Sequence, residues 1–244
     1  MPRPMAQRRI ALERSAEGVL TVLLDRPAKR NALDGPAVEQ LLEAFGTPDV
    51  RAFVLASSDP LCFCAGADLT LGDDVRAGVS DQLYELYQRM LHAPAPIVAA
   101  LGGAAVGGGA QLAIASDLRV ATPGTTLRFP GPGHGLAVGA WGLPSLVGRG
   151  RALDLCLTMR PVGAEEAAAI GLVDRVVDDA RGTAAALAAG IATLDPSAAT
   201  RVKRVAADAA GALLAAVARE RGENRAAWSG STAGLAKPRH GGER

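Results

Sequence analysis

A long uncharged stretch that is rich in glycine constrains the fold more than any other part of this sequence. Residues 93–116 include no charged side chain over 24 positions, and two glycine clusters interrupt them. The stretch is long enough to cross a bilayer, but its prolines and glycines leave few large apolar side chains to face lipid. A buried strand over 97–101, a glycine turn and a buried helix over 110–115 fit better. We expect an interior segment and no association with a membrane.

Composition excludes several classes of protein. The chain has 244 residues, of which 49% are hydrophobic and 3% aromatic, with a formal net charge of +1. This length suits one full-sized core, and the high apolar content argues against disorder. Balanced charge and few aromatic rings argue against nucleic-acid binding. The three cysteines lack the spacing of a metal site, and no secretory signal is visible. We therefore expect reduced thiols, no bound metal and a cytoplasmic location.

Short apolar runs alternate with amphipathic helical stripes in the first half of the chain. Strands are predicted at 10–13, 19–24, 52–56 and 97–101, and helical stripes at 38–45 and 83–91. This alternation predicts an α/β fold with right-handed crossovers around a parallel sheet.

The second half of the chain is mostly helical and rich in alanine. Helices are predicted at 152–158, 164–169, 183–193 and 198–218, and a short apolar run covers 172–177. We assign residues 1–195 to the core, 196–228 to a C-terminal helical region that packs on another subunit, and 229–244 to a flexible tail.

The run from Gly102 to Gly109 follows a predicted strand and leads into a predicted helix. It lacks the Gly-Lys-Ser/Thr ending of a phosphate-binding loop and the spacing of a dinucleotide fingerprint. Unpaired backbone N–H groups at such a turn meet the positive end of a helix dipole and can stabilise an oxyanion. Close packing of the two elements is the alternative, and the run alone does not separate the two.

Two further segments are candidates for a site. The small-residue loop Phe63-Cys-Ala-Gly-Ala-Asp68 follows a predicted strand, and Asp68 could simply cap a turn. The basic turn that contains Arg26, Lys29 and Arg30 would suit phosphates, although a solvated surface loop is the usual meaning of such a run.

Together these segments resemble the enoyl-CoA hydratase/isomerase (crotonase) family. The family shows L-x-R-P-x-x-x-N-A-L, F-x-A-G-A-D-L and A-x-x-G-x-A-x-G-G-G in this order. Here they are found at 24–33, 63–69 and 100–109, and Ser116–Ala121 and Ala164–Val176 match two later motifs. The resemblance covers roughly residues 10–225. It implies a crotonase-like spiral of ββα units, a C-terminal trimerisation region, and a homotrimer or hexamer.

The resemblance also implies an acyl-CoA substrate, with coenzyme A as part of that substrate and no other cofactor. The family's two oxyanion-hole amides map to Ala65 and Gly108. Coenzyme A would be held by Arg26, Lys29 and Arg30 near its phosphates and by Ala67 and Asp68. Trp141 is expected to line or close the acyl pocket.

The acid–base residues depart from the family pattern. Gln111 and Gly133 occupy the positions that the resemblance assigns to the two glutamates of hydratases. As a catalytic residue, Gln111 can orient a water molecule or a substrate oxygen, but it cannot take a proton at neutral pH. His134, next to the second position, is the best remaining base. Two hypotheses stay open. The first is an acyl-CoA enzyme of fatty acid metabolism that stabilises an enolate and catalyses a non-standard reaction. The second is a catalytically silent paralogue that binds acyl-CoA or serves as a subunit.

Overall fold

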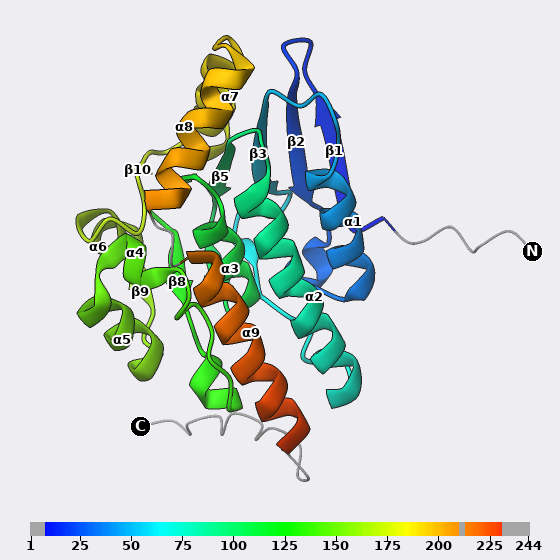
Figure 1. The fold of residues 1–244 in the computed structure, drawn as a ribbon, viewed down its shortest axis with the longest axis vertical. Helices are drawn as coiled ribbons and strands as arrows, with labels where there is room; N and C mark the ends of the chain where they lie inside the picture. Colours follow the sequence, from blue (N-terminus) through cyan, green and yellow to red (C-terminus); the bar gives the residue numbers. More distant parts are fainter. Residues whose placement is uncertain (1–7, 210–212, 231–244) are drawn as a thin grey trace, which may run out of the picture.

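Two β-sheets form the centre of the fold, and helices surround them (Figure 1). The structure is a computed structural model that describes residues 8–209 and 213–230. The larger sheet has the strand order β1-β2-β3-β5-β7-β10 and the smaller one β4-β6-β8-β9. The larger sheet comprises β1 (Ile10–Arg14), β2 (Val19–Leu24), β3 (Ala52–Ser57), β5 (Ile97–Leu101), β7 (Leu118–Ala121) and β10 (Arg175–Val176). The smaller sheet comprises β4 (Cys62–Cys64), β6 (Ala104–Val106), β8 (Thr126–Arg128) and β9 (Val162–Gly163).

Most neighbouring strands are parallel, as the alternation of strands and helices predicts. Only the outer pairs β1–β2 and β8–β9 are antiparallel in the described chain. The strands β3 and β5 are buried along nearly their whole length. Strands of this kind are typical of a parallel sheet that is covered on both faces.

Helices from the whole described chain pack around the two sheets. They are α1 (Gly35–Phe45), α2 (Asp73–His92), α3 (Gly108–Ala115), α4 (Leu143–Val147), α5 (Arg149–Thr158), α6 (Ala164–Ala169), α7 (Ala180–Ala192), α8 (Pro196–Ala209) and α9 (Leu213–Gly230). Two 3₁₀ turns, η1 (Pro27–Lys29) and η2 (Gly131–His134), lie in the connecting loops. The large core lies between the sheets, α1, α2 and α3.

An alanine stripe on α7 covers the other face of the larger sheet. Ala180, Ala184, Ala188 and Ala192 recur every fourth residue and are buried against small apolar side chains of β2, β3, β5 and β7. Residues four apart lie on one face of a helix. The high alanine content therefore allows this helix to lie close to the strands.

The uncharged stretch is interior, as predicted. It forms β5, β6 and α3, and every residue of α3 is buried. In the described residues no helix is long and apolar enough to cross a membrane.

The structure departs from the sequence predictions in two places. The three-residue strands β4, β6 and β8 of the smaller sheet were not predicted, because segments of this length show no periodicity. The helical pattern at 198–218 belongs to two helices, α8 and α9, with residues 210–212 between them outside the described residues. Of the predicted tail, only residues 229–230 are described, and they belong to α9.

Candidate functional site

The candidate site lies where two neighbouring parallel strands of the smaller sheet end. Strand β4 pairs with β6, with Cys62 opposite Ala104 and Cys64 opposite Ala105. The loop from 65 to 72 follows β4, and the glycine turn into α3 follows β6. Because the strands are parallel, both loops leave the same edge of the sheet. The fold therefore brings together two of the segments that the sequence singled out.

Glycines allow these two loops to touch. A Cβ atom at Gly66 would lie 2.6 Å from the carbonyl oxygen of Val106 and 3.1 Å from the amide nitrogen of Gly108. A Cβ atom at Gly109 would collide with the carbonyl and side chain of Cys64. Gly66 and Gly107 also have positive φ angles, of 84° and 54°, which side chains disfavour. The glycines of this turn thus allow close packing, and the same close approach leaves the backbone accessible to form a site.

The loop after β4 is hydrogen-bonded along its length to the basic turn. The amide of Leu33 donates to the carbonyl of Gly66, and the amide of Asp68 donates to that of Leu33, at 2.8 and 2.9 Å. The buried Asn31 side chain donates to the hydroxyl of Ser57 at 2.7 Å and to the carbonyl of Phe63 at 3.1 Å. The basic turn, the loop after β4 and the glycine turn, which the sequence singled out, are therefore all in contact through the loop after β4.

These bonds decide which amides remain free. The N–H of Ala65 donates to the carbonyl of Arg30 at 2.9 Å. The prediction that Ala65 supplies an oxyanion donor is therefore wrong, because its hydrogen is already used. Within the described ranges, the amides of Ala67 and Gly108 have no acceptor. Gly108 is the first residue of α3, where backbone N–H groups have no partner within the helix.

Gln111 lies one helical turn after Gly108 and is 4% exposed. Its side-chain oxygen accepts from the indole Nε1 of Trp141 at 2.9 Å and from the amide of Gly139 at 3.0 Å. Its nitrogen donates to the hydroxyl of Tyr87 at 3.4 Å. The Trp141 and Tyr87 rings stack with centroids 5.8 Å apart. Aromatic side chains therefore fill the space beside the glycine turn.

Comparison with known proteins shows the family of this chain. A model of the family described as enoyl-CoA hydratase/isomerase matches residues 14–224. The chain belongs to the enoyl-CoA hydratase/isomerase family. It is 43% identical over 199 residues to "Probable enoyl-CoA hydratase echA6" of Mycobacterium tuberculosis, covering 79% of this chain and 80% of that protein. It is 36% identical over 200 residues to "Putative enoyl-CoA hydratase/isomerase YngF" of Bacillus subtilis, covering 77% of each chain.

Solved structures agree on the crotonase fold. The enoyl-CoA hydratase/isomerase from Xanthobacter autotrophicus Py2 superposes with a TM-score of 0.79 at 28% identity, covering 90% of this chain and 88% of the other. The enoyl-CoA hydratase from Bacillus anthracis gives a TM-score of 0.79 at 25% identity and covers 92% of each chain. The predicted fold class is confirmed.

The basic turn of this family member divides into a structural part and an exposed part. Arg26 contacts Asp34 at 3.2 Å and Asp68 at 3.1 Å, and its side chain is 18% exposed. Asp68 is itself buried and also accepts from the hydroxyl of Thr70. Arg26 and Asp68 therefore join the basic turn to the loop after β4, and the prediction that they also hold coenzyme A stays a prediction. Lys29 and Arg30 are exposed and remain candidates.

The position to which the resemblance assigns the family's second glutamate lies in η2. Gly133 is there, and its amide donates to the sulfur of Met159 at 3.1 Å. His134 is half-buried, and burial, followed by the charges of Arg76 and Arg128, lowers its pKa below the usual value. His134 is therefore neutral at pH 7 and able to accept a proton. The cysteines are free thiols, and burial raises the pKa of Cys64 to about 12, which makes it a poor nucleophile.

A buried polar cluster from α2 and α9 was missed by sequence analysis. Glu220 accepts from the hydroxyl of Tyr84 at 2.9 Å and from the amides of Gly139 and Trp141 at 3.1 and 2.8 Å. Asn224, one turn later, accepts from the amide of Ala137 at 2.8 Å and donates to its carbonyl at 2.7 Å. The signal in the sequence is a pair of polar residues, Glu220 and Asn224, four positions apart on α9. The residues that they bind lie 79–140 positions away in the sequence.

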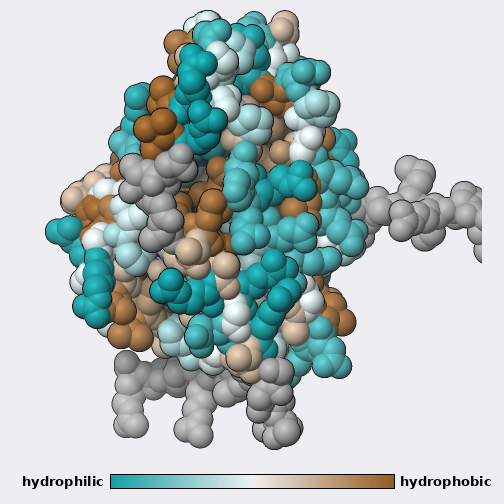
Figure 2. All heavy atoms as spheres, viewed as in Figure 1, coloured by the Kyte–Doolittle hydropathy of each residue, from teal (hydrophilic) through white to brown (hydrophobic). Residues whose placement is uncertain are grey.

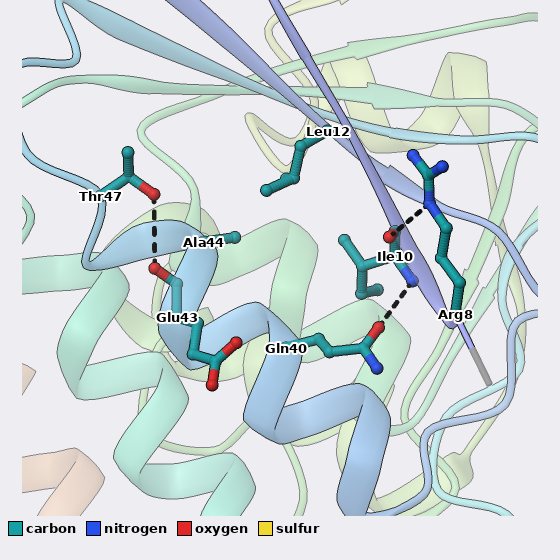
Figure 3. A pocket seen from close by; sticks show the side chains of 7 residues that line it. All are labelled: Arg8, Ile10, Leu12, Gln40, Glu43, Ala44 and Thr47. Atoms are coloured by element: carbon teal, nitrogen blue, oxygen red, sulfur yellow. Dashed lines mark hydrogen bonds between the residues drawn. The ribbon is translucent and has the colours of Figure 1, made fainter. Parts of the chain in front are cut away.

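A surface cavity of about 330 Å³ lies elsewhere, between β1 and α1 (Figure 3). Gln40 accepts from the amide of Ile10 at its edge, and Glu43 and Arg8 line it. None of the predicted site residues lines this cavity. In the part of the chain that the structure describes, no cluster of three or more His, Cys, Asp or Glu side chains could hold a metal ion.

Proposed function

We propose that this protein binds an acyl-CoA thioester and polarises its carbonyl between the amides of Ala67 and Gly108. The observation that carries the proposal is that these two amides have no acceptor in the described residues and belong to loops in contact with each other. A thioester oxygen that gains negative charge is stabilised by such donors, and losing one typically costs about 3–4 kcal/mol of barrier. The polarised carbonyl acidifies the α-carbon and makes the β-carbon electrophilic.

The standard hydration reaction is not part of the proposal. Gln111 and Gly133 replace both carboxylates, so no pair of acid and base is present to add water. His134 is the remaining candidate base for isomerisation, hydrolysis or C–C cleavage of the acyl group. Its lowered pKa supports this assignment, because the neutral ring accepts a proton.

Coenzyme A would approach over the exposed side chains of Lys29 and Arg30, with the backbone of Ala67 near the adenine. These cations are at the surface and next to the loop of Ala67, whereas Arg26 is held in ion pairs. Phosphates are held as point charges by lysine and in a planar fork by arginine.

We also propose that the protein assembles as a homotrimer or a hexamer through its C-terminal helices. The side chains of Val202 and Val205 on α8 are 71% and 63% exposed. Figure 2 shows hydrophobic side chains over this part of the surface. Exposed valines of one helix face are expected to be covered by a second copy.

The second candidate is a silent acyl-CoA-binding paralogue. It is favoured by the oxygen of Gln111, which already accepts two hydrogen bonds and is not available to orient a water molecule. Calorimetric binding of a short trans-2-enoyl-CoA, run beside a hydration assay, separates the candidates. We expect binding in both cases and no hydration. Robust hydration would contradict the proposal, and turnover of another kind that His134→Ala abolishes would favour the enzyme over the silent paralogue.

A further inference from the structure

The groups that surround the Gln111 side-chain amide determine which of its two ends is the oxygen. An indole N–H and a backbone N–H can only donate. The Gln111 atom that faces both Trp141 Nε1 and Gly139 N must therefore be the oxygen, at 2.9 and 3.0 Å. The side-chain nitrogen then points the other way, toward Tyr87, whose hydroxyl donates to the carbonyl of Gly108 at 3.3 Å.

The two residues that donate to the Gln111 oxygen also donate backbone hydrogen bonds to a single carboxylate. The oxygen Oε1 of Glu220 shares the amide hydrogen of Gly139 with Gln111, at 3.1 Å, and Oε2 accepts from the backbone amide of Trp141 at 2.8 Å. Residues 137–141 have no regular secondary structure, so the hydrogen bonds to α9 satisfy backbone amides that a neighbouring strand would otherwise pair with. The hydroxyl of Tyr84 completes the shell of Glu220.

Glu220 cannot itself act as the missing base. Its two oxygens accept from the Tyr84 hydroxyl and from the backbone amides of Gly139, Ala140 and Trp141, and the side chain is 5% exposed. A carboxylate that accepts from fixed donors on both oxygens orients those donors and has no lone pair directed at a substrate.

We infer that Glu220 is a positioning residue that, through Gly139 and Trp141, fixes Gln111 with its nitrogen toward Tyr87, whose hydroxyl in turn holds the carbonyl of Gly108 at the proposed thioester site. The inference deepens the proposed function and rests on it. In this orientation the Gln111 oxygen is already used twice and offers no acceptor to orient water next to Gly108, while the nitrogen reaches the glycine turn through Tyr87. Helix α9 thereby positions the turn that carries the Gly108 amide.

The test compares Glu220→Gln with Glu223→Gln, an exposed glutamate on the same helix. A push–pull chromophore such as 4-dimethylaminocinnamoyl-CoA reports polarisation of its thioester as a red shift of absorbance. We expect Glu220→Gln to lose at least half of that red shift and to bind this ligand about tenfold more weakly, since a buried bond to a charged group is worth about 1.5–3 kcal/mol. Glu223→Gln should match the wild type, and both should bind free CoA equally.

A double-mutant cycle with Gln111→Met separates positioning from general stability. Methionine has a similar length and donates no hydrogen bond. If Glu220 acts through Gln111, then Glu220→Gln causes no further loss of red shift in the Gln111→Met background. Additive losses, or a full red shift in Glu220→Gln, would overturn the inference. If Glu220→Gln does not fold, Glu220→Asp is used, because the shorter carboxylate cannot reach both amides.

A second measurement distinguishes failure of the inference from failure of the proposed function. The indole N–H signal of Trp141 in nitrogen-15 NMR, assigned with Trp228→Phe, reports the bond to Gln111 without any ligand. We expect it to move upfield in Glu220→Gln and not in Glu223→Gln. A wild type that produces no red shift with a moved indole signal would reject the proposed function alone. An unmoved indole signal would reject the role of Glu220.

Discussion

Arg26 and its neighbours show that charged residues in one turn have different tasks. Arg26 is the partner of two buried carboxylates, Asp34 and Asp68, and also donates to the carbonyl of Ala32 at 3.0 Å. Lys29 and Arg30 face solvent three and four residues later. Composition of the turn alone could not divide these cations, because the division depends on carboxylates up to 42 residues away.

The first prediction concerns Arg26→Ala. Removing the cation leaves Asp34 and Asp68 buried beside each other with less compensation, and we expect a loss of about 2–3 kcal/mol in the free energy of unfolding. Urea denaturation measures it. The control Arg30→Ala should leave stability within about 0.5 kcal/mol and weaken binding of CoA instead. Equal stability losses in the two variants would contradict this division of tasks.

The second prediction concerns Gln111→Glu. A carboxylate can accept from Trp141 Nε1 and Gly139 N as the amide oxygen does, and the Tyr87 hydroxyl can turn to donate to it. Because Glu220 shares the Gly139 hydrogen, the variant places a second buried carboxylate beside it, and we expect a loss of about 3 kcal/mol or more in the unfolding free energy at pH 7. Hydration of an enoyl-CoA should still be absent, because Gly133 supplies no second carboxylate. Measurable hydration by this single variant would show that one carboxylate suffices here.

Single backbone angles explain why the motif located the loop but not the donor. Ala65 and Ala67 are two residues apart, and in an extended strand their amides would point the same way. The positive φ of 84° at Gly66 breaks this alternation, so one amide reaches Arg30 and the other does not. Sequence analysis singled out this loop and the Gly108 turn, which the structure brings into contact, but which of the two alanine amides lacks an acceptor depends on the backbone path.

At the scale of elements, α9 is fastened to α2 by charge as well as by the buried cluster. Asp81 on α2 accepts from Arg221 at 2.7 and 2.6 Å and also from Arg225. Hydrogen bonds from these two arginines hold the pKa of Asp81 well below its usual range. An acid with a lowered pKa in the folded state contributes stability above its unfolded pKa, and the contribution is lost as the pH falls.

The third prediction follows for Asp81→Asn. Since Asp81 and Arg221 are 30% and 22% exposed, solvent screens the pair, and we expect a loss of only about 1 kcal/mol at pH 7. The difference from the wild type should shrink as the pH falls below about 4, where the carboxyl of the unfolded chain is already protonated. Urea denaturation at several pH values measures this. A difference that stays constant into acid would show that packing, and not charge, joins the helices.

Element lengths decided how much of the fold could be predicted. The strands β2, β3 and β5 and the helices α1, α2 and α7 span five or more residues and carry visible periodicity. The strands β4, β6 and β8 span three residues each and could be found only as parts of motifs. Glu220 was missed for another reason. A glutamate on a C-terminal helix normally faces solvent, and its burial depends on a loop far away in the sequence.

At the scale of the whole molecule, exposed valines on α8 predict assembly. The fourth prediction is that Val202→Glu with Val205→Glu reduces the mass in solution from a multiple of the 24.8 kDa chain to a single chain. Introduced charges at an apolar interface are costly because they lose water without gaining a partner. Analytical ultracentrifugation measures the mass. A wild type that is already monomeric would contradict the proposed trimer, as would a double variant that remains assembled.

The fastening of residues 137–141 to α9 has a consequence for biosynthesis. The bond between Tyr84 and Glu220 joins residues that are 136 positions apart. Contacts of such wide separation form late, after the local units. During translation, the sheets and the two glycine turns can assemble before α9 has left the ribosome, while Trp141 and Gln111 still lack the carboxylate that orients them. A nascent or prematurely terminated chain without α9 would thus lack the carboxylate that holds Gly139 and Trp141, and the proposed acyl site would be completed only when α9 packs.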